Sequence, residues 1–320
     1  MKRIAILTSG GDAPGMNAHI RAVVRTGIAR GLEVIGIVGG YEGLMEGNFK
    51  KLERKDTVNI VSQGGTILKT SRSEVFLTKE GRAKGAKQLK DNNIDAVIAC
   101  GGDGTLKGAH ALFKEHAIRI VGTPGTIDND LYGTYYTIGF DTACNTAAEA
   151  IDRIRDTADS HGRVFIVEVM GRHEGHIAME VGISCGAEYI SVPEAVTNLE
   201  ILYDKYTQLG FHNRTIIVIG EGGGKYKGAF ELAAALKAEY NIDAKCAVLG
   251  HIQRGGSPTV RDRTLASHLG LSAVDALLAG KTNVLVGRVH HNITYTPFPE
   301  TWTKRKELQP YMFDLAELLA

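Results

Sequence analysis

The chain is poor in the residues that mark several large classes of protein. Its 320 residues include only four cysteines, Cys100, Cys144, Cys185 and Cys246, and no two have Cys-x-x-Cys spacing. This disfavours both a disulfide framework and a four-cysteine zinc site. Seven prolines accompany 39 glycines. The glycine excess therefore does not come from a disordered Pro/Gly tract, and it indicates tight turns and close approaches of the backbone.

An excess of charge of one sign and long apolar runs are also missing. The chain has 37 Lys and Arg against 36 Asp and Glu, a net charge of +1. It therefore lacks the concentrated positive field that nucleic-acid binding needs. The first apolar run, 4–7, is too short for a signal peptide, and no run reaches the ~18 residues of a membrane span. We expect a cytoplasmic protein with no nucleic-acid or membrane partner.

The apolar pattern predicts an α/β fold. Short runs rich in β-branched residues end in glycine or a polar turn, as buried parallel strands do, at 4–8, 34–38, 96–100, 118–122, 164–170, 216–220, 247–250 and 284–287. Stretches with helical periodicity lie between them, at 17–30, 142–160 and 259–279. About eight to eleven strands are too many for one sheet, so we expect two doubly wound sheets. The expected domains are 1–139 plus about 252–304, and 140–251 plus about 305–320.

Glycine clusters follow three of the predicted strands, at 9–15, 101–105 and 220–224. Ligands of open α/β sheets bind beyond the carboxyl ends of strands, and backbone N–H groups at a helix start bind phosphate. A helix starting near Leu106 would place Asp103 among such groups, and a carboxylate beside phosphate needs a cation such as Mg²⁺. The alternative is that each cluster is only a tight turn. Gly280-Lys281-Thr282 is no Walker A ending, because Asp275 stands where the first glycine belongs.

An acidic turn, 124–130, follows the strand expected at 118–122. Asp128 or Asp130 there can take a proton from an attacking hydroxyl, or the segment can be an Asx turn that bonds its own backbone. Both readings stay open on the residues alone.

Four arginines in or beside loops, flanked by Ser or Gly, suit a phosphorylated ligand because guanidinium binds phosphate in a bidentate manner. They are Arg72, Arg163, Arg172 and Arg254. The segment 173–176 lacks zincin spacing, since Ile177 stands where the second histidine belongs, and it is interpreted as a loop or helix start. His290-His291 is interpreted as a solvated turn.

Taken in order, the segments 7–17, 101–105, 124–130, 169–172 and 250–258 resemble the bacterial type of the ATP-dependent 6-phosphofructokinase family over essentially the whole chain. The resemblance implies two similar doubly wound domains, one binding nucleotide and the other sugar phosphate, with the active site in the cleft between them. It implies transfer of the γ-phosphoryl of MgATP to the 1-hydroxyl of fructose 6-phosphate in glycolysis, by an allosteric homotetramer.

The resemblance also implies roles for individual residues. The catalytic group is Asp128 as general base, with Thr126, Arg72 and Arg172 around the transferring phosphoryl. Asp103 positions Mg²⁺. The ATP side comprises Gly11, Tyr41, Arg72, Ser73, Gly102, Asp103, Gly104, Thr105 and Gly108. The sugar-phosphate side comprises Thr126, Ile127, Asp128, Arg163, Met170, Gly171, Arg172, Glu221, Lys245, His251, Ile252, Gln253 and Arg254. Arg163 and Lys245 would reach in from a neighbouring subunit. The effector site would contain Arg21, Arg25, Arg54, Arg155 and Glu188.

The chain departs from the family pattern in three places. Lys245 replaces an arginine, which keeps the charge and loses the bidentate fork. The segment 73–77 lacks the usual aromatic, proline and arginine pattern. Lysines of the effector site are replaced by Gly210, His212 and Asn213, so we expect regulation by ADP or phosphoenolpyruvate to be reduced or altered.

The residues disfavour three other functions. In the pyrophosphate-dependent relatives, as the resemblance has it, a bulky acid stands at Gly104 and a lysine at Gly125, so the two glycines here favour ATP. An NAD or lipid kinase would share 101–105 but leaves 124–130 and 250–258 unexplained. A non-catalytic sugar-phosphate sensor has no need of a base beside a magnesium site.

Overall fold

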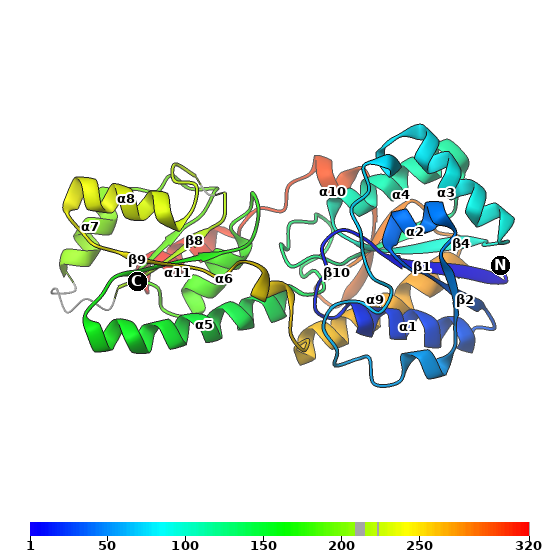
Figure 1. The fold of residues 1–320 in the computed structure, drawn as a ribbon, viewed down its shortest axis with the longest axis horizontal. Helices are drawn as coiled ribbons and strands as arrows, with labels where there is room; N and C mark the ends of the chain where they lie inside the picture. The colour runs from blue at the N-terminus through cyan, green and yellow to red at the C-terminus, as the bar shows by residue number, and fades with distance from the viewer. Residues whose placement is uncertain (209–214, 223, 320) are drawn as a thin grey trace. The chain divides into compact units, whose positions relative to one another are not determined.

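The computed structural model describes residues 1–208, 215–222 and 224–319. The chain forms two units (Figure 1), and it passes between them several times. Unit 1 contains Met1–Ile127, Leu131–Thr142 and Arg254–Lys306, and unit 2 contains Asp128–Asp130, Ala143–Gln253 and Glu307–Ala320. The sequence expectation had placed 128–130 in the first domain, whereas these residues belong to unit 2.

Unit 1 is built on a seven-stranded sheet in the order β11-β10-β5-β4-β1-β2-β3. Its strands are β1 (Arg3–Thr8), β2 (Glu33–Ile37), β3 (Phe49–Leu52), β4 (Ala96–Gly101), β5 (Ile120–Pro124), β10 (Val284–Val289) and β11 (Asn292–Pro297). The pairs from β2 through β1, β4 and β5 to β10 are parallel, and β3 and β11 run antiparallel at the two edges. The central strands are fully buried, as their unbroken apolar sequences predict.

Helices cover both faces of this sheet (Figure 1), with α1 and α9 on one face and α2, α3 and α4 on the other. They are α1 (Met16–Ala29), α2 (Gly40–Glu46), α3 (Lys79–Asp91), α4 (Asp103–His116), α9 (Val260–Leu278) and α10 (Glu300–Thr303), with the short 3₁₀ turns η1 (Arg54–Thr57) and η2 (Val75–Leu77). Gly270 lets α9 approach α1 closely, because a Cβ there would lie 2.7 Å from the Ala22 Cβ and 2.9 Å from the His19 carbonyl oxygen.

Unit 2 has a four-stranded sheet in the order β7-β8-β6-β9, parallel throughout. Its strands are β6 (Phe165–Val169), β7 (Tyr189–Ser191), β8 (Ile216–Gly220) and β9 (Lys245–Val248), and its helices are α6 (His176–Ser184), α7 (Leu199–Gln208), α8 (Ala229–Tyr240) and α11 (Pro310–Leu318). The helix α5 (Phe140–His161) and the turn η3 (Gly250–Arg254) each contain residues of both units.

The eight predicted strands and three predicted helices are present, with ends shifted by a few residues. The helix after β4 starts at Asp103, three residues before the expected start, so Asp103 is its first residue. Residues 173–175 are a loop and His176 is the first residue of α6, and His290-His291 is the turn between β10 and β11, as predicted. In the described part of the chain, no helix combines the length and the apolar character needed to cross a membrane.

Candidate active site

The glycine-rich turns of unit 1 gather at one edge of its sheet. The parallel register pairs Thr8 of β1 with Cys100 of β4, and Gly101 of β4 with Pro124 of β5. The carboxyl ends of the three strands are therefore level, and the segments 9–11, 101–105 and 125–127 all leave the sheet at this edge. This is the edge at which open parallel sheets bind ligands.

Close packing fixes the turn between β4 and α4. The Thr105 hydroxyl donates to the Ser9 carbonyl oxygen at 3.1 Å, which ties the β1 turn to the start of α4. A Cβ on Gly101 would lie 2.5 Å from that same carbonyl, so only glycine fits there. At Gly104 an added Cβ would have no heavy atom within 4 Å. The helix start thus presents N–H groups beside open space, which suits a phosphate.

Asp103, which the sequence predicts to position magnesium, is the first residue of α4. Its Oδ2 atom accepts a 2.7 Å ion pair from Lys107 Nζ, one turn along α4. Its Oδ1 atom is buried and has no hydrogen-bond partner among the described residues. A buried carboxylate oxygen of this kind fits a Mg²⁺ ion, which is commonly held by one or two carboxylates plus substrate phosphates and water. The described residues contain no cluster of three or more His, Cys, Asp or Glu side chains that could hold a metal ion.

Tyr41 supports the start of α4. Its hydroxyl donates to the Thr105 carbonyl oxygen at 2.6 Å, and its ring stacks on Phe76 with centroids 4.0 Å apart. Burial raises the pKa of Tyr41 above its ordinary value, so the phenol stays protonated and donates. A Cβ on Gly108 would lie 2.9 Å from the Tyr41 ring. Tyr41 and Gly108, expected on the ATP side, therefore pack together in the core and hold the turn between β4 and α4.

Two arginines of unit 1 differ in their surroundings. Arg254 is 8% exposed, and its Nη1 atom donates to the Asp12 carbonyl oxygen at 3.3 Å. The same Nη1 atom lies 2.2 Å from the position of a Cβ added at Gly11, so a side chain there would displace the guanidinium. Gly11 was expected beside ATP and Arg254 beside the sugar phosphate, so the structure brings residues of the two expected groups into contact. Arg72 is exposed, and no partner for its side chain is found in the described ranges. Ser73 follows it, and its hydroxyl accepts a 3.4 Å bond from the Phe76 amide.

In unit 2, Asp128 and Arg172 form the central pair. Asp128 is 1% exposed, and its Oδ2 atom lies 3.2 Å from Arg172 Nε. The Arg172 side chain remains 43% exposed, so part of the guanidinium faces solvent. The pair joins a buried carboxylate to a partly free cation, and the two side chains come from segments more than forty positions apart. This arrangement suits a base and a phosphate-binding group that act on neighbouring atoms.

A strained turn orients Arg172. Its φ of 56° is in the left-handed region, which is costly for a residue with a Cβ and is common at functional sites. Gly171 precedes it with φ of 145°, and a Cβ there would lie 2.5 Å from the Glu174 carbonyl oxygen. The Glu221 carboxylate accepts from the amides of Arg172 at 3.0 Å and Gly171 at 3.4 Å. Glu221, expected at the sugar, therefore holds the backbone that carries Arg172.

Arg163 and Lys245 lie at the other end of the same sheet. Arg163 precedes β6, Lys245 opens β9, and the two strands pair Phe165 with Lys245. Lys245 Nζ is 2.9 Å from the Asp243 carboxylate. The five residues of β6 are separated by four rises of about 3.3 Å, so these cations lie at least roughly 13 Å from the carboxyl ends that lead to Arg172. They cannot share a small site with Arg172 in the same unit.

The other expected substrate residues are distributed around these groups. Thr126 and Ile127 of unit 1 are buried, and Thr126 is adjacent to Gly102, whose added Cβ would lie 3.6 Å from the Thr126 Cβ. Met170 of unit 2 is 8% exposed at the end of β6. In η3, His251 and Ile252 are exposed and Gln253 is buried.

The expected effector residues form one group in each unit. In unit 1, Arg21 and Arg25 lie one turn apart on α1, against the η1 turn that carries Arg54, and Arg25 Nε donates to Thr57 at 3.1 Å. In unit 2, Arg155 Nη1 is 3.4 Å from the Glu188 carboxylate.

Arg155 Nη2 also donates to the carbonyls of Cys185 and Gly186. Cationic groups at the end of α6 are favourable there. The replaced lysine positions, Gly210, His212 and Asn213, lie outside the described residues.

Two residues of the site were missed by the sequence reading. Lys107 pairs with Asp103, and the i, i+4 spacing of opposite charges on a helix was the available signal. Phe76 stacks on Tyr41. No local pattern predicts that contact, because the two residues are 35 positions apart in different elements.

Comparison with known proteins agrees with this geometry. The family model described as Phosphofructokinase matches residues 3–277. "ATP-dependent 6-phosphofructokinase 1" of Thermus thermophilus is 52% identical over 322 residues and covers 100% of both chains. "ATP-dependent 6-phosphofructokinase" of Cytophaga hutchinsonii is 48% identical over 321 residues, with 100% of this chain and 98% of that protein covered.

Solved structures show the same likeness. The structure of phosphofructokinase from Saccharomyces cerevisiae superposes with a TM-score of 0.88 at 37% identity, covering 100% of this chain and 48% of that chain. Pichia pastoris phosphofructokinase in the T-state gives a TM-score of 0.84 at 36% identity, covering 94% of this chain and 35% of that one. This chain thus spans about half or less of the yeast chains, although it spans the whole of the bacterial relatives. By sequence over its full length and by fold, the chain belongs to the phosphofructokinase family.

Proposed function

We propose that the chain is an ATP-dependent 6-phosphofructokinase of glycolysis, which transfers the γ-phosphoryl group of ATP to the 1-hydroxyl of fructose 6-phosphate. The single observation that carries the proposal is the pairing of buried Asp128 with partly exposed Arg172 at 3.2 Å. The match to bacterial relatives of that name over the full chain length supports the same activity.

The proposed chemistry assigns each group a step. The 1-hydroxyl oxygen forms a bond to the γ-phosphorus while the bond to the β–γ bridging oxygen breaks, and ADP leaves with that oxygen. Asp128 accepts the hydroxyl proton. Arg172 and Arg72 donate to the equatorial oxygens of the phosphoryl group, with Thr126 as a further donor, because a loose transition state spreads its charge over those oxygens.

The nucleotide side rests on unit 1. Backbone N–H groups at the start of α4 are proposed to bind phosphate oxygens. Gly102 and Gly104 have no side chains that would cover these groups. Asp103 is the proposed ligand of Mg²⁺, which when bound supplies positive charge that neutralises the phosphates. Lys107 already pairs with the Oδ2 atom of the Asp103 carboxylate. Binding of Mg²⁺ would therefore either weaken this ion pair or leave it on Oδ2 alone.

ATP is preferred over pyrophosphate as the donor. No heavy atom lies within 4 Å of a Cβ placed at Gly104, so the space beside the helix start is open to a group larger than pyrophosphate. At Gly125 an added Cβ would lie 2.7 Å from Cys100 Sγ, so the lysine that the pyrophosphate-dependent pattern implies has no room in this packing. Both glycines therefore favour the nucleotide.

The site is proposed to be completed by a second copy of the chain in a homotetramer. Arg163 and Lys245 lie at the end of the unit 2 sheet remote from Arg172, so they can serve a sugar phosphate only in a neighbouring subunit.

The cytoplasm, where glycolytic substrates are found, is the proposed location. Effector control through Arg21, Arg25, Arg54, Arg155 and Glu188 is proposed to be reduced or altered relative to typical members. If phosphoenolpyruvate shifts the saturation curve as strongly as it does in typical members, the proposal of reduced effector control is wrong.

A coupled assay that detects fructose 1,6-bisphosphate tests the proposal. We expect product with ATP and Mg²⁺, little with pyrophosphate, and none when Mg²⁺ is chelated. Product from pyrophosphate at a comparable rate, or no product with any donor, overturns the assignment. Sedimentation of the active enzyme as a monomer would contradict the tetramer without affecting the assigned reaction.

A further inference from the structure

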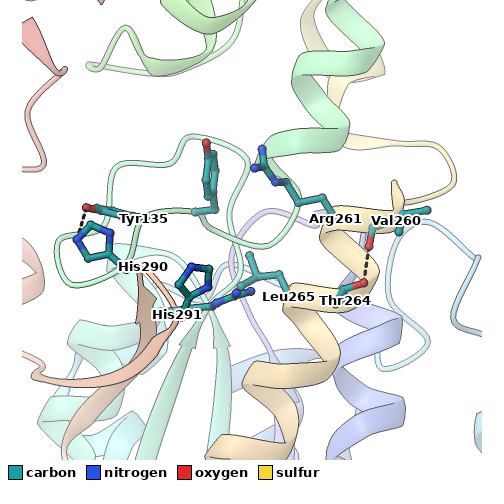
Figure 2. Close-up of a pocket in the computed structure, with 9 residues that line it drawn as sticks. Tyr135, Val260, Arg261, Thr264, Leu265, His290 and His291 are labelled. Atoms are coloured by element: carbon teal, nitrogen blue, oxygen red, sulfur yellow. Dashed lines mark hydrogen bonds between the residues drawn. The ribbon is translucent and has the colours of Figure 1, made fainter. Parts of the chain in front are cut away.

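A cavity in unit 1 lies apart from every residue assigned above to ATP, sugar phosphate or effector. It is formed by the loop before α5, the first two turns of α9 and the turn between β10 and β11 (Figure 2). Its volume of about 630 Å³ is in the range of small-molecule sites. The lining residues are Tyr135, Tyr136, Val260, Arg261, Thr264, Leu265, Arg288, His290 and His291.

The polar lining is cationic. Arg261 and Arg288 supply the positive charge, His290 and His291 add imidazole rings, and the lining drawn from the described residues contains no carboxylate. Arg261 is partly balanced, because its Nη1 atom lies 3.5 Å from Asp141. A pocket lined by donors without acidic groups favours an anion through charge-assisted hydrogen bonds.

Arg288 is the donor best suited to that anion. Its Nε atom is buried and has no hydrogen-bond acceptor within the described ranges. The backbone of Arg288 is fixed by the loop before α5, because its amide donates to Thr134 Oγ1 at 3.2 Å and its carbonyl accepts from the Tyr135 amide at 2.9 Å. A guanidinium N–H held in place without an acceptor gains more from an incoming anion than one already paired.

The remaining wall is aromatic. The Tyr135 and His290 rings meet edge to face with centroids 4.8 Å apart, and Tyr135 Oη lies 3.0 Å from His290 Nε2, the contact drawn in Figure 2. The Arg261 guanidinium lies over the Tyr136 ring, 4.3 Å from the ring centre. Leu265 is buried at the base. Flat rings and the apolar side chains of Val260 and Leu265 favour a planar ring on the ligand.

We propose that this cavity binds a small molecule that carries a phosphate or carboxylate group on a planar ring, with Arg288 as the main anion contact. The proposal is independent of the reaction assigned to the enzyme. It concerns a ligand site built at the edge of the unit 1 sheet, where the turn after β10 meets α9.

Isothermal titration calorimetry with phenyl phosphate and with benzoate tests it. Fructose 6-phosphate and MgADP are kept saturating throughout, so that the substrate phosphate sites are filled. The variant is Arg288→Gln, and the matched control is Arg119→Gln, another half-buried arginine of unit 1 that does not line the cavity. Unchanged turnover and melting temperature of both variants show that the fold is kept.

We expect the wild type and Arg119→Gln to bind at least one of the two probes with the same affinity, and Arg288→Gln to bind it about tenfold more weakly or worse. The probe that binds more tightly identifies the acidic group. A crystal soaked with 4-bromophenyl phosphate should give an anomalous bromine peak beside Tyr135 and Leu265. Failure of both probes to bind, equal affinity in Arg288→Gln, or a bromine peak only elsewhere overturns the proposal.

Discussion

Replacing Gly104 with aspartate tests whether the start of α4 receives the nucleotide. An added Cβ at this position meets no heavy atom within 4 Å, and Gly104 is the second residue of the helix. The substitution therefore needs no repacking. An acidic residue in the first turn of a helix is favourable by about 0.3–1 kcal/mol, so the melting temperature should not fall.

The expected loss of nucleotide affinity follows from like charge. Two negative charges about 4 Å apart repel by about 4 kcal/mol at an effective dielectric constant near 20, and solvent screening reduces this to about 2–4 kcal/mol. The KM for ATP should rise about 30-fold to 1,000-fold. The KM for fructose 6-phosphate, measured at saturating ATP, should stay within about threefold.

Gly104→Ala is the matched control, because it adds the same Cβ without charge. Its KM for ATP should remain within about threefold, and the helix should gain up to about 1 kcal/mol from the loss of glycine. Steady-state kinetics with ATP and with pyrophosphate, on all three proteins, give the comparison. If Gly104→Asp keeps the wild-type KM for ATP, the nucleotide does not bind at this helix start.

Three further outcomes are expected. Asp128→Ser should lower kcat by about 10²–10⁴ while both KM values change only a few-fold, and an unchanged kcat would remove Asp128 from proton transfer. Lys107→Met removes an exposed i, i+4 ion pair to Asp103 that is worth about 0.3–0.5 kcal/mol. The Mg²⁺ concentration at half-maximal activity should therefore fall about twofold. A rise in that concentration would mean that Lys107 assists Mg²⁺ binding. Burial lowers the pKa of His19 to about 3, against about 6.5 unfolded, so its stabilising contribution is complete above pH 6.5 and is lost as the pH falls. Between pH 7 and pH 5 the free energy of unfolding should fall by about 2 kcal/mol because of this histidine. His19→Leu should remove that fall when unfolding by urea is measured at both pH values. An equally steep pH dependence in the variant would show that other groups cause it.

The sequence predicts the interior of the fold better than its edges. β1, β4 and β5 carry unbroken apolar runs because helices cover both of their faces. β3, β7 and β11 were not predicted. β3 has the sequence FKKL with two exposed lysines, and β11 has exposed or half-buried residues at every position except Thr296, as edge strands do. β7 has only three residues, too few for a pattern.

The candidate site divides in the same way. Motif spacing singles out Asp103 and Asp128 as candidates, because each follows a predicted strand. It did not reveal that Glu221 bonds the Gly171 and Arg172 amides, since that contact joins two turns about 50 positions apart. The same holds for the cavity at Arg288, whose walls come from three separated segments. Local pattern carries no information on such tertiary pairings.

The close packing of α1 against α9, made possible by Gly270, has a consequence for how the protein is made. The two helices cover each other on one face of the unit 1 sheet, yet α9 emerges from the ribosome roughly 230 positions after α1, or about 10–50 seconds later at ordinary rates of translation. Throughout that interval the part of α1 that packs against α9 has no native partner. Newly made chains should therefore depend on chaperones until α9 has been synthesised, and termination before α9 should yield aggregation-prone fragments rather than a folded first unit.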